Sequence, residues 1–173
     1  MIEDGDRVIG DSWAIANYLE DTYPDRPSLF GGAGGRANAL FFHCWAAAVL
    51  HPGVARCVVA DIHDHLLDED RDYFRATREK IFGKSLEEVQ AGREDSVKGL
   101  RQALNPLRLM LSSQPFIGGD GPLYADYLAF GALQWARVIS PFKILTPDSA
   151  VHGWFQRCLD LHGGLGRAQP GYD

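Results

Sequence analysis

The residues with the clearest chemical potential lie near the beginning of the sequence, between Asp11 and Pro24. Asp11 and Ser12 each carry a short side-chain oxygen that can cap a helix. Apolar residues follow at helical spacing, Ile15, Tyr18 and Leu19. Pro24 ends the helix, because a residue before proline is pushed away from helical angles. The free N–H groups at such a start favour a carboxylate ligand, although an ordinary capped surface helix has the same pattern.

A second polar cluster, Asp61-Ile62-His63-Asp64-His65, could suggest a metal site. On a helix, Asp61 and His65 share a face, whereas His63 and His65 point well apart. Structural zinc usually needs four ligands, and no cysteine or further histidine stands at ligand spacing. We therefore expect a solvated polar turn and no metal.

The three cysteines, Cys44, Cys57 and Cys158, are widely spaced and form no CxxC motif. Arg56 beside Cys57 could lower the pKa of that thiol, but no cysteine has a base or partner at a recognisable spacing. We expect three free, unreactive thiols in a reduced intracellular protein.

Length and charge narrow the class of protein. A chain of 173 residues suits one domain or one and a fraction, and 46% apolar residues suffice for an ordinary core. A net charge of −6 gives no indication of nucleic-acid binding. We see neither an apolar run long enough to span a membrane nor a basic-then-apolar leader, so we expect a cytoplasmic protein.

The elements that must position these residues are mostly helices. Asp4-Gly5 predicts a hairpin within Met1 to Ile9, which is too short to be stable without further strands. Residues 26–35 are rich in glycine and proline and predict a linker, in which Leu29 and Phe30 dock onto the next domain.

From Arg36 onward the pattern is helical. We expect helices over residues 37–50, 54–67, 68–82, 85–112, 124–139 and 148–163, followed by a frayed tail. Pro52-Gly53 should kink or interrupt the chain, and Pro106 should bend it. Ser85 and Glu88 form a capping-box pattern. Aromatic residues are expected to face the core: Phe41, Phe42, Trp45 and Trp135.

The stretch Asp11-Ser12-x-x-Ile15-x-x-Tyr18-Leu19, ending in Tyr23-Pro24, resembles the close of the thioredoxin-like domain in glutathione transferases. The resemblance implies that Asp11 and Ser12 hold the γ-glutamyl end of glutathione. It also implies that residues 1–25 are a remnant of the glutathione-binding domain. The earlier strands, the catalytic residue and the cis-proline would then precede Met1.

Phe116-Ile117-Gly118-Gly119-Asp120 and Tyr124-Ala125-Asp126-Tyr127 resemble the loop and buried helix start of the same family. The resemblance places Asp126 at a structural aspartate that fixes this helix. Leu123 stands where the family has a capping serine or threonine, so the reciprocal capping box cannot form.

A third resemblance runs through Pro24-Asp25-Arg26-Pro27, Arg71-Asp72-Tyr73, residues 86–95 and Leu165-Gly166-Arg167. These segments are similar to those of the β-etherase branch of the family, which uses glutathione to cleave aromatic ethers. In the family, the helix after the linker lines the hydrophobic substrate pocket and contributes to a dimer face. Some of Phe41, Phe42 and Trp45 are therefore candidates for contacting an aromatic substrate, or they fill the core.

We thus expect a mainly α fold, in which residues 36–173 form a five- or six-helix glutathione transferase C-terminal domain. The expected function of the full-length protein is glutathione-dependent cleavage or conjugation of aromatic substrates, with a possible homodimer. The isolated chain should have weak or no activity. The alternative is a non-catalytic helical module for binding or dimerisation.

Overall fold

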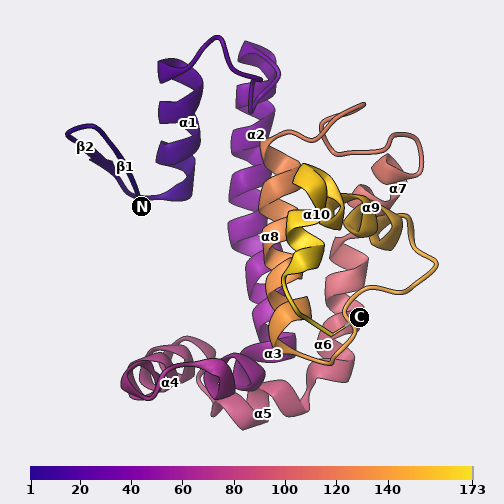
Figure 1. Ribbon diagram of the computed structural model, residues 1–173. Coiled ribbons are helices and arrows are strands. Elements are labelled where there is room, and N and C mark those ends of the chain that lie inside the picture. Colours follow the sequence, from indigo (N-terminus) through magenta and orange to yellow (C-terminus); the bar gives the residue numbers. More distant parts are fainter. Residues whose placement is uncertain (173) are drawn as a thin grey trace.

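The computed structural model describes residues 1–172, and its front is a hairpin followed by one helix. Strands β1 (Ile2–Asp4) and β2 (Arg7–Ile9) pair antiparallel, with Ile2 opposite Ile9. Helix α1 (Ser12–Thr22) follows at once. In Figure 1 the hairpin points away from the helical bundle while α1 lies beside it. The predicted hairpin and short helix are confirmed.

One long helix forms the axis of the molecule. Its segments are α2 (Ala33–Trp45), a π-helical turn η1 (Ala46–Leu50) and α3 (His51–His65). The predicted interruption at Pro52-Gly53 is therefore wrong. The π turn shifts the hydrogen-bond register just before Pro52, so the helix continues past a residue that has no N–H to donate. Gly53 lies close to Leu100, since a Cβ at residue 53 would lie 2.8 Å from Leu100 Cδ1 and would require that side chain to shift.

The same helix also corrects the expectation that no apolar run is long enough to span a membrane. Between Ala33 and His65 one 18-residue window reaches a mean hydropathy of 1.2, and 39% of it is buried inside the protein. By length and composition alone, this helix could span a membrane. In the structure, α3 packs against α6 (Arg93–Ala103) and α8 (Tyr124–Ile139), as the central helix of a bundle does.

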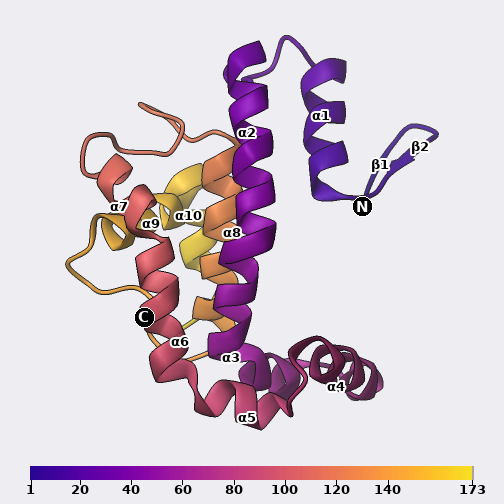
Figure 2. The same ribbon diagram turned by 180° about the vertical axis from the view of Figure 1, so that it is seen from behind.

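The next helices form the base and one side of the bundle. Helix α4 (Asp68–Phe82) has no buried residue and projects sideways at the base in both views (Figures 1 and 2). The Ser85–Glu88 capping box is confirmed, because Ser85 N donates to Glu88 Oε2 at 3.0 Å and Glu88 N to Ser85 Oγ at 3.2 Å. The single helix expected to Ser112 is instead divided into three: α5 (Leu86–Ala91), α6 and α7 (Asn105–Leu111).

The C-terminal third closes the bundle. Helix α8 has the predicted bounds, and Ser149 caps α9 (Ala150–Leu159) by accepting from His152 N at 3.1 Å. The left-handed backbone of His162, Gly163 and Gly164 breaks the helix where Gly163-Gly164 was expected to end it. The expectation that no helix follows is wrong, because α10 (Leu161–Ala168) continues after this break. The tail is not frayed up to Tyr172, whose N–H donates to the Arg137 carbonyl at 2.9 Å. Asp173 lies outside the described residues.

The Asp126 carboxylate is the only buried charged group reported for residues 1–172, and it joins three parts of the bundle. It accepts from Ile117 N at 2.7 Å, Gly118 N at 2.9 Å and Leu123 N at 3.0 Å. It also accepts from Trp154 Nε1 at 2.8 Å. Leu123 offers no capping oxygen, so only the aspartate half of the capping box exists, as predicted. Asp126 is structural.

The tryptophan buried in the core is Trp154, and not Trp135 as the sequence suggested. The Trp154 side chain is fully buried, whereas Trp135 is 40% exposed. The expectation that Trp135 faces the core is therefore wrong. Residue 135 lies on the outer face of α8, while Ala132, Leu133 and Ala136 form its buried face.

Replacing Asp126 by asparagine should destabilise the protein by about 3 kcal/mol. An amide offers one acceptor oxygen and directs an NH2 group at backbone donors that the carboxylate now satisfies. Urea denaturation would measure the change, and Asp120→Asn on the exposed part of the same loop is the matched control. Equal unfolding midpoints for the two variants would contradict the role given to Asp126.

Candidate functional site

The start of α1 is an exposed acid–hydroxyl pair. Asp11 is the cap, since its Oδ1 accepts from Trp13 N at 3.0 Å and Ala14 N at 2.9 Å. Its backbone has a φ of 70°, a left-handed conformation that is uncommon for a residue with a side chain. Ser12 is the first helical residue, and both side chains are exposed. The helix start is therefore open to solvent.

This helix start is fixed by aromatic contacts with the bundle. The Trp13 ring lies 5.3 Å from that of Phe30, 5.5 Å from that of His43 and 5.4 Å from that of Tyr124, measured between centroids. Phe30 is 1% exposed, and the Leu29 carbonyl accepts from Tyr124 N at 2.8 Å. The predicted docking of the linker by Leu29 and Phe30 is thus confirmed.

A polar contact crosses the same interface. The buried Tyr124 hydroxyl lies 2.9 Å from His43 Nδ1. Burial raises the pKa of Tyr124, and a hydrogen bond with the Ser12 side chain partly opposes this shift. Tyr124 therefore interacts with both Ser12 and His43. Sequence reasoning missed His43 and Tyr124 as a pair, because 81 residues separate them and no local pattern joins them.

The side chains of Asp11 and Ser12 suit the zwitterionic end of an amino acid. Asp11 Oδ2 makes no hydrogen bond to another residue within 1–172, so it can accept from an ammonium group. The Ser12 hydroxyl can donate to a carboxylate, which the positive end of the α1 dipole also favours. The arrangement can bind a zwitterionic amino-acid group, but it supplies no nucleophile.

The aromatic residues singled out from the sequence gather at one groove. Phe41, Phe42 and Trp45 line a cavity of about 660 Å³ between α2, α7 and the loop before α8, which we call the aromatic groove. The Phe42 and Trp45 rings lie 5.1 Å apart. Phe41 is 74% exposed, so the expectation that it faces the core is wrong. Phe41 and His43 are two residues apart and thus lie on nearly opposite faces of α2.

Residues 61–65 belong to α3, inside the helix expected over residues 54–67, but Asp61 is half-buried and not solvated as expected. Asp61 accepts from Gln90 Nε2 at 2.8 Å and from the Ser140 hydroxyl, and Arg93 lies 3.5 Å away. The carboxylate therefore joins α3 to the helices around it. Across residues 1–172, no group of three His, Cys, Asp or Glu side chains could hold a metal ion.

The three thiols differ in their surroundings. Cys57 and Cys158 are buried, and burial raises the pKa of Cys57 to about 11 and that of Cys158 to about 12. Cys44 is exposed on α2. The expectation of three unreactive thiols is thus supported by burial for only two of them.

Comparison with known proteins identifies the family of this chain. The model of the glutathione S-transferase C-terminal domain family matches residues 37–160. The chain therefore belongs to the glutathione S-transferase C-terminal domain family. The "glutathione S-transferase-like protein ustS" of Aspergillus flavus is 30% identical over 140 residues, which are 73% of this chain and 50% of that protein.

Solved glutathione transferases share the fold. GSTFuA3 from Phanerochaete chrysosporium is 32% identical with a TM-score of 0.63, over 91% of this chain and 60% of that one. GSTFuA2 from the same organism is 30% identical with a TM-score of 0.67, over 91% and 62%. CsGST63524 of Ceriporiopsis subvermispora, solved with glutathione, is 25% identical with a TM-score of 0.64, over 90% and 61%. The chain thus spans half the length of the curated relative and about 60% of the solved ones.

In the folded protein, only Cys44 should react with a thiol reagent at pH 8, because burial keeps the other two protonated and inaccessible. A colorimetric disulfide reagent should report one thiol per chain under native conditions and three after denaturation. Cys44→Ser should abolish the native signal. Rapid native reaction of the Cys44→Ser variant would show that Cys57 or Cys158 is open to solvent.

Proposed function

We propose that this chain is the helical part of a glutathione transferase and that the start of α1 holds the γ-glutamyl end of glutathione. The observation that carries the proposal is the open Asp11–Ser12 pair, which Trp13 and Tyr124 fix against the bundle. Two structural neighbours from Ceriporiopsis subvermispora were solved in complex with glutathione, which supports it. No metal takes part in this proposal.

The proposed enzyme divides into residues 1–25, which belong to the glutathione-binding layer, a linker at 26–35, and the helical domain at 36–173. A glutathione thiolate needs a donor close to its sulfur, and Asp11 and Ser12 face the other end of the tripeptide. We infer that the donor lies outside this chain, in keeping with the greater length of its relatives. The isolated chain should then turn over glutathione and aromatic electrophiles weakly or not at all.

We further propose that the substrate is an aromatic molecule of the β-aryl ether type. The support is the resemblance running from Pro24-Asp25-Arg26-Pro27 to Leu165-Gly166-Arg167. The aromatic groove adds to it, since Phe42 and Trp45 present adjacent rings that suit an aromatic ligand. The groove and the α1 site share Phe30 and Tyr124 as a common wall.

A second candidate function for the aromatic groove is docking of a second copy of the chain. Phe41 is 74% exposed, and it lies on the face of α2 opposite His43 and thus away from the proposed glutathione site. Leu40 and Met110 are also exposed, at 44% and 43%. An exposed apolar surface of this kind is typical of protein interfaces. In this case the chain acts as a dimerisation module.

Replacing Ser12 by alanine should weaken glutathione binding to the purified chain about tenfold, because one hydrogen bond to a charged group is lost. Isothermal titration calorimetry would measure the affinity. Ser113→Ala is the matched protein control, since Ser113 is exposed and remote from α1. Cysteinylglycine, which lacks the γ-glutamyl end, should not distinguish Ser12→Ala from the wild type. Equal glutathione affinities for Ser12→Ala and the wild type would exclude the proposed site.

Replacing Phe41 by glutamate separates the two functions of the aromatic groove. An aromatic-substrate groove predicts about tenfold weaker binding of an aromatic ether, followed by Trp fluorescence, and an unchanged sedimentation coefficient. A docking groove predicts a shift from dimer to monomer in sedimentation. Tyr73→Glu is the control, because Tyr73 has the same 74% exposure on the distant helix α4. An effect of equal size in Tyr73→Glu would remove the groove from both functions.

A further inference from the structure

A histidine and a tyrosine of the helical bundle connect it with Ser12, the serine of the proposed glutathione site. His43 of α2 is half-buried, and its Nδ1 atom lies 2.9 Å from the hydroxyl oxygen of Tyr124, the first residue of α8. The same hydroxyl forms a hydrogen bond with the Ser12 side chain. Within residues 1–172 the Tyr124 hydroxyl has no further partner. Ser12, Tyr124 and His43, each from a different helix, therefore form a series of hydrogen bonds that we call the hydrogen-bond relay.

Aromatic packing keeps the relay in place. The Tyr124 side chain is buried, and its ring lies 5.4 Å from that of Trp13 and 5.6 Å from that of Phe30, measured between centroids. Trp13 follows Ser12 directly in the sequence, and its ring also lies 5.5 Å from that of His43. Because rings packed on several sides cannot move freely, the Tyr124 hydroxyl stays between its two partners. What can change is which group donates each hydrogen bond.

A hydroxyl group has a single hydrogen to donate, and this limits what Ser12 can do for a ligand. If Tyr124 donates to Nδ1 of His43, the Tyr124 oxygen can only accept from Ser12, and the Ser12 hydrogen then points into the bundle. If Nδ1 of His43 carries a hydrogen and donates it, the Tyr124 hydrogen is free to go to Ser12. The Ser12 hydrogen then points towards solvent, where a carboxylate can accept it. The hydrogen on His43 thus decides whether Ser12 acts as an acceptor or as a donor.

We propose that His43 and Tyr124 are positioning residues of the glutathione site. With a hydrogen on Nδ1, His43 donates to Tyr124, and Tyr124 donates to Ser12. Ser12 in turn donates to the α-carboxylate of the γ-glutamyl group, while Asp11 Oδ2 accepts from the ammonium group. This inference rests on the proposed function, and it adds that two residues of the helical domain control the affinity of the site without touching glutathione.

Single variants test the relay by isothermal titration calorimetry of the purified chain with glutathione. Tyr124→Phe keeps the ring but removes the hydroxyl, so the glutathione affinity should fall about fivefold. His43→Leu removes the donor and should cause a loss of the same size. His43→Asn should stay within about twofold of the wild type, because its amide has an N–H donor at the same number of bonds from the backbone as Nδ1. If His43 only filled space, leucine would replace it better than asparagine.

Double variants show whether the effect passes through Ser12. Residues that interact give non-additive losses, whereas the losses from independent residues add in free energy. In the Ser12→Ala background, Tyr124→Phe and His43→Leu should therefore not lower the glutathione affinity any further. A general loss of packing would lower the affinity by the same factor in both backgrounds, because it does not need the serine hydroxyl.

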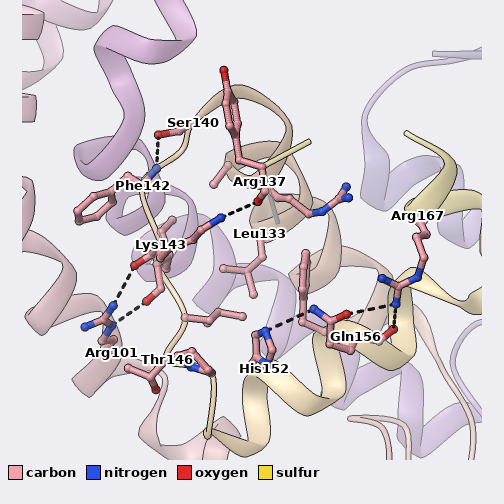
Figure 3. Close-up of a pocket in the computed structure, with 16 residues that line it drawn as sticks. Arg101, Leu133, Arg137, Ser140, Phe142, Lys143, Thr146, His152, Gln156 and Arg167 are labelled. Atoms are coloured by element: carbon pink, nitrogen blue, oxygen red, sulfur yellow. Dashed lines mark hydrogen bonds between the residues drawn. The ribbon is translucent and has the colours of Figure 1, made fainter. Parts of the chain in front are cut away.

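The protein offers a matched control for each residue of the bundle. Tyr127 lies on α8 as well, and its hydroxyl forms a similar pair with His162 Nε2 at 3.1 Å, so Tyr127→Phe should leave the glutathione affinity unchanged. His152 is half-buried like His43, and its Nε2 lies 3.4 Å from Nε2 of Gln156. Figure 3 shows this pair in a cavity that no residue of the relay lines. His152→Leu should therefore also have no effect.

An unchanged affinity in Tyr124→Phe would overturn the inference, and so would equal losses in the wild-type and Ser12→Ala backgrounds. Tighter binding by His43→Leu than by His43→Asn, or a loss in Tyr127→Phe as large as in Tyr124→Phe, would do the same. None of these results removes the proposed glutathione site if Ser12→Ala still binds glutathione more weakly than the wild type. Equal affinities of Ser12→Ala and the wild type would instead remove the site and the relay together.

Discussion

The buried carboxylate of Asp126 is the interaction on which the rest of this structure depends. An ionised group out of contact with water is costly unless its oxygens are fully hydrogen-bonded. Here three backbone N–H groups and the Trp154 indole satisfy it. The start of α8, the loop before it and α9 are thereby held in one arrangement.

The functional surfaces follow from that arrangement. The backbone N–H groups of Ile117, Gly118 and Leu123 all donate to Asp126. The same three residues line the aromatic groove. Tyr124 is the first residue of α8, the helix that Asp126 fixes. Its hydroxyl is hydrogen-bonded to His43, and its ring packs against that of Trp13. A structural aspartate thus sets the position of the wall against which the proposed glutathione-binding residues rest.

The proposed glutathione site and the aromatic groove share Phe30 and Tyr124 as a wall, but they use different faces of the long helix. The long helix presents His43 towards α1 and Phe41 towards the aromatic groove, two residues and nearly half a turn apart. The bundle therefore places the proposed amino-acid site next to the aromatic surface, with Phe30 and Tyr124 between them.

The sequence by itself determined the features that depend on neighbours along the chain. The hairpin, the capping box at Ser85 and the bounds of α8 could all be predicted, because turns, caps and helical periodicity are local. The role of Asp126 was implied by the family resemblance alone. The family resemblance also predicted the fold class. The choice of Asp11 over Ser12 as cap is also local, but the hydrogen bonds from Trp13 N and Ala14 N that decide it were visible only in the structure.

Tertiary structure alone decided which surfaces meet. Sequence patterns show that a helix has an apolar face, but not which residue of that face is covered, so Trp135 and Phe41 were wrongly expected in the core while Trp154 is fully buried. The long helix continues past Pro52 after a π turn, and no residue type in the sequence predicts that turn. The contact of His43 with Tyr124 joins residues that are 81 positions apart in the sequence. Such contacts arise only when helices pack, because packing and not chain order sets which side chains become neighbours.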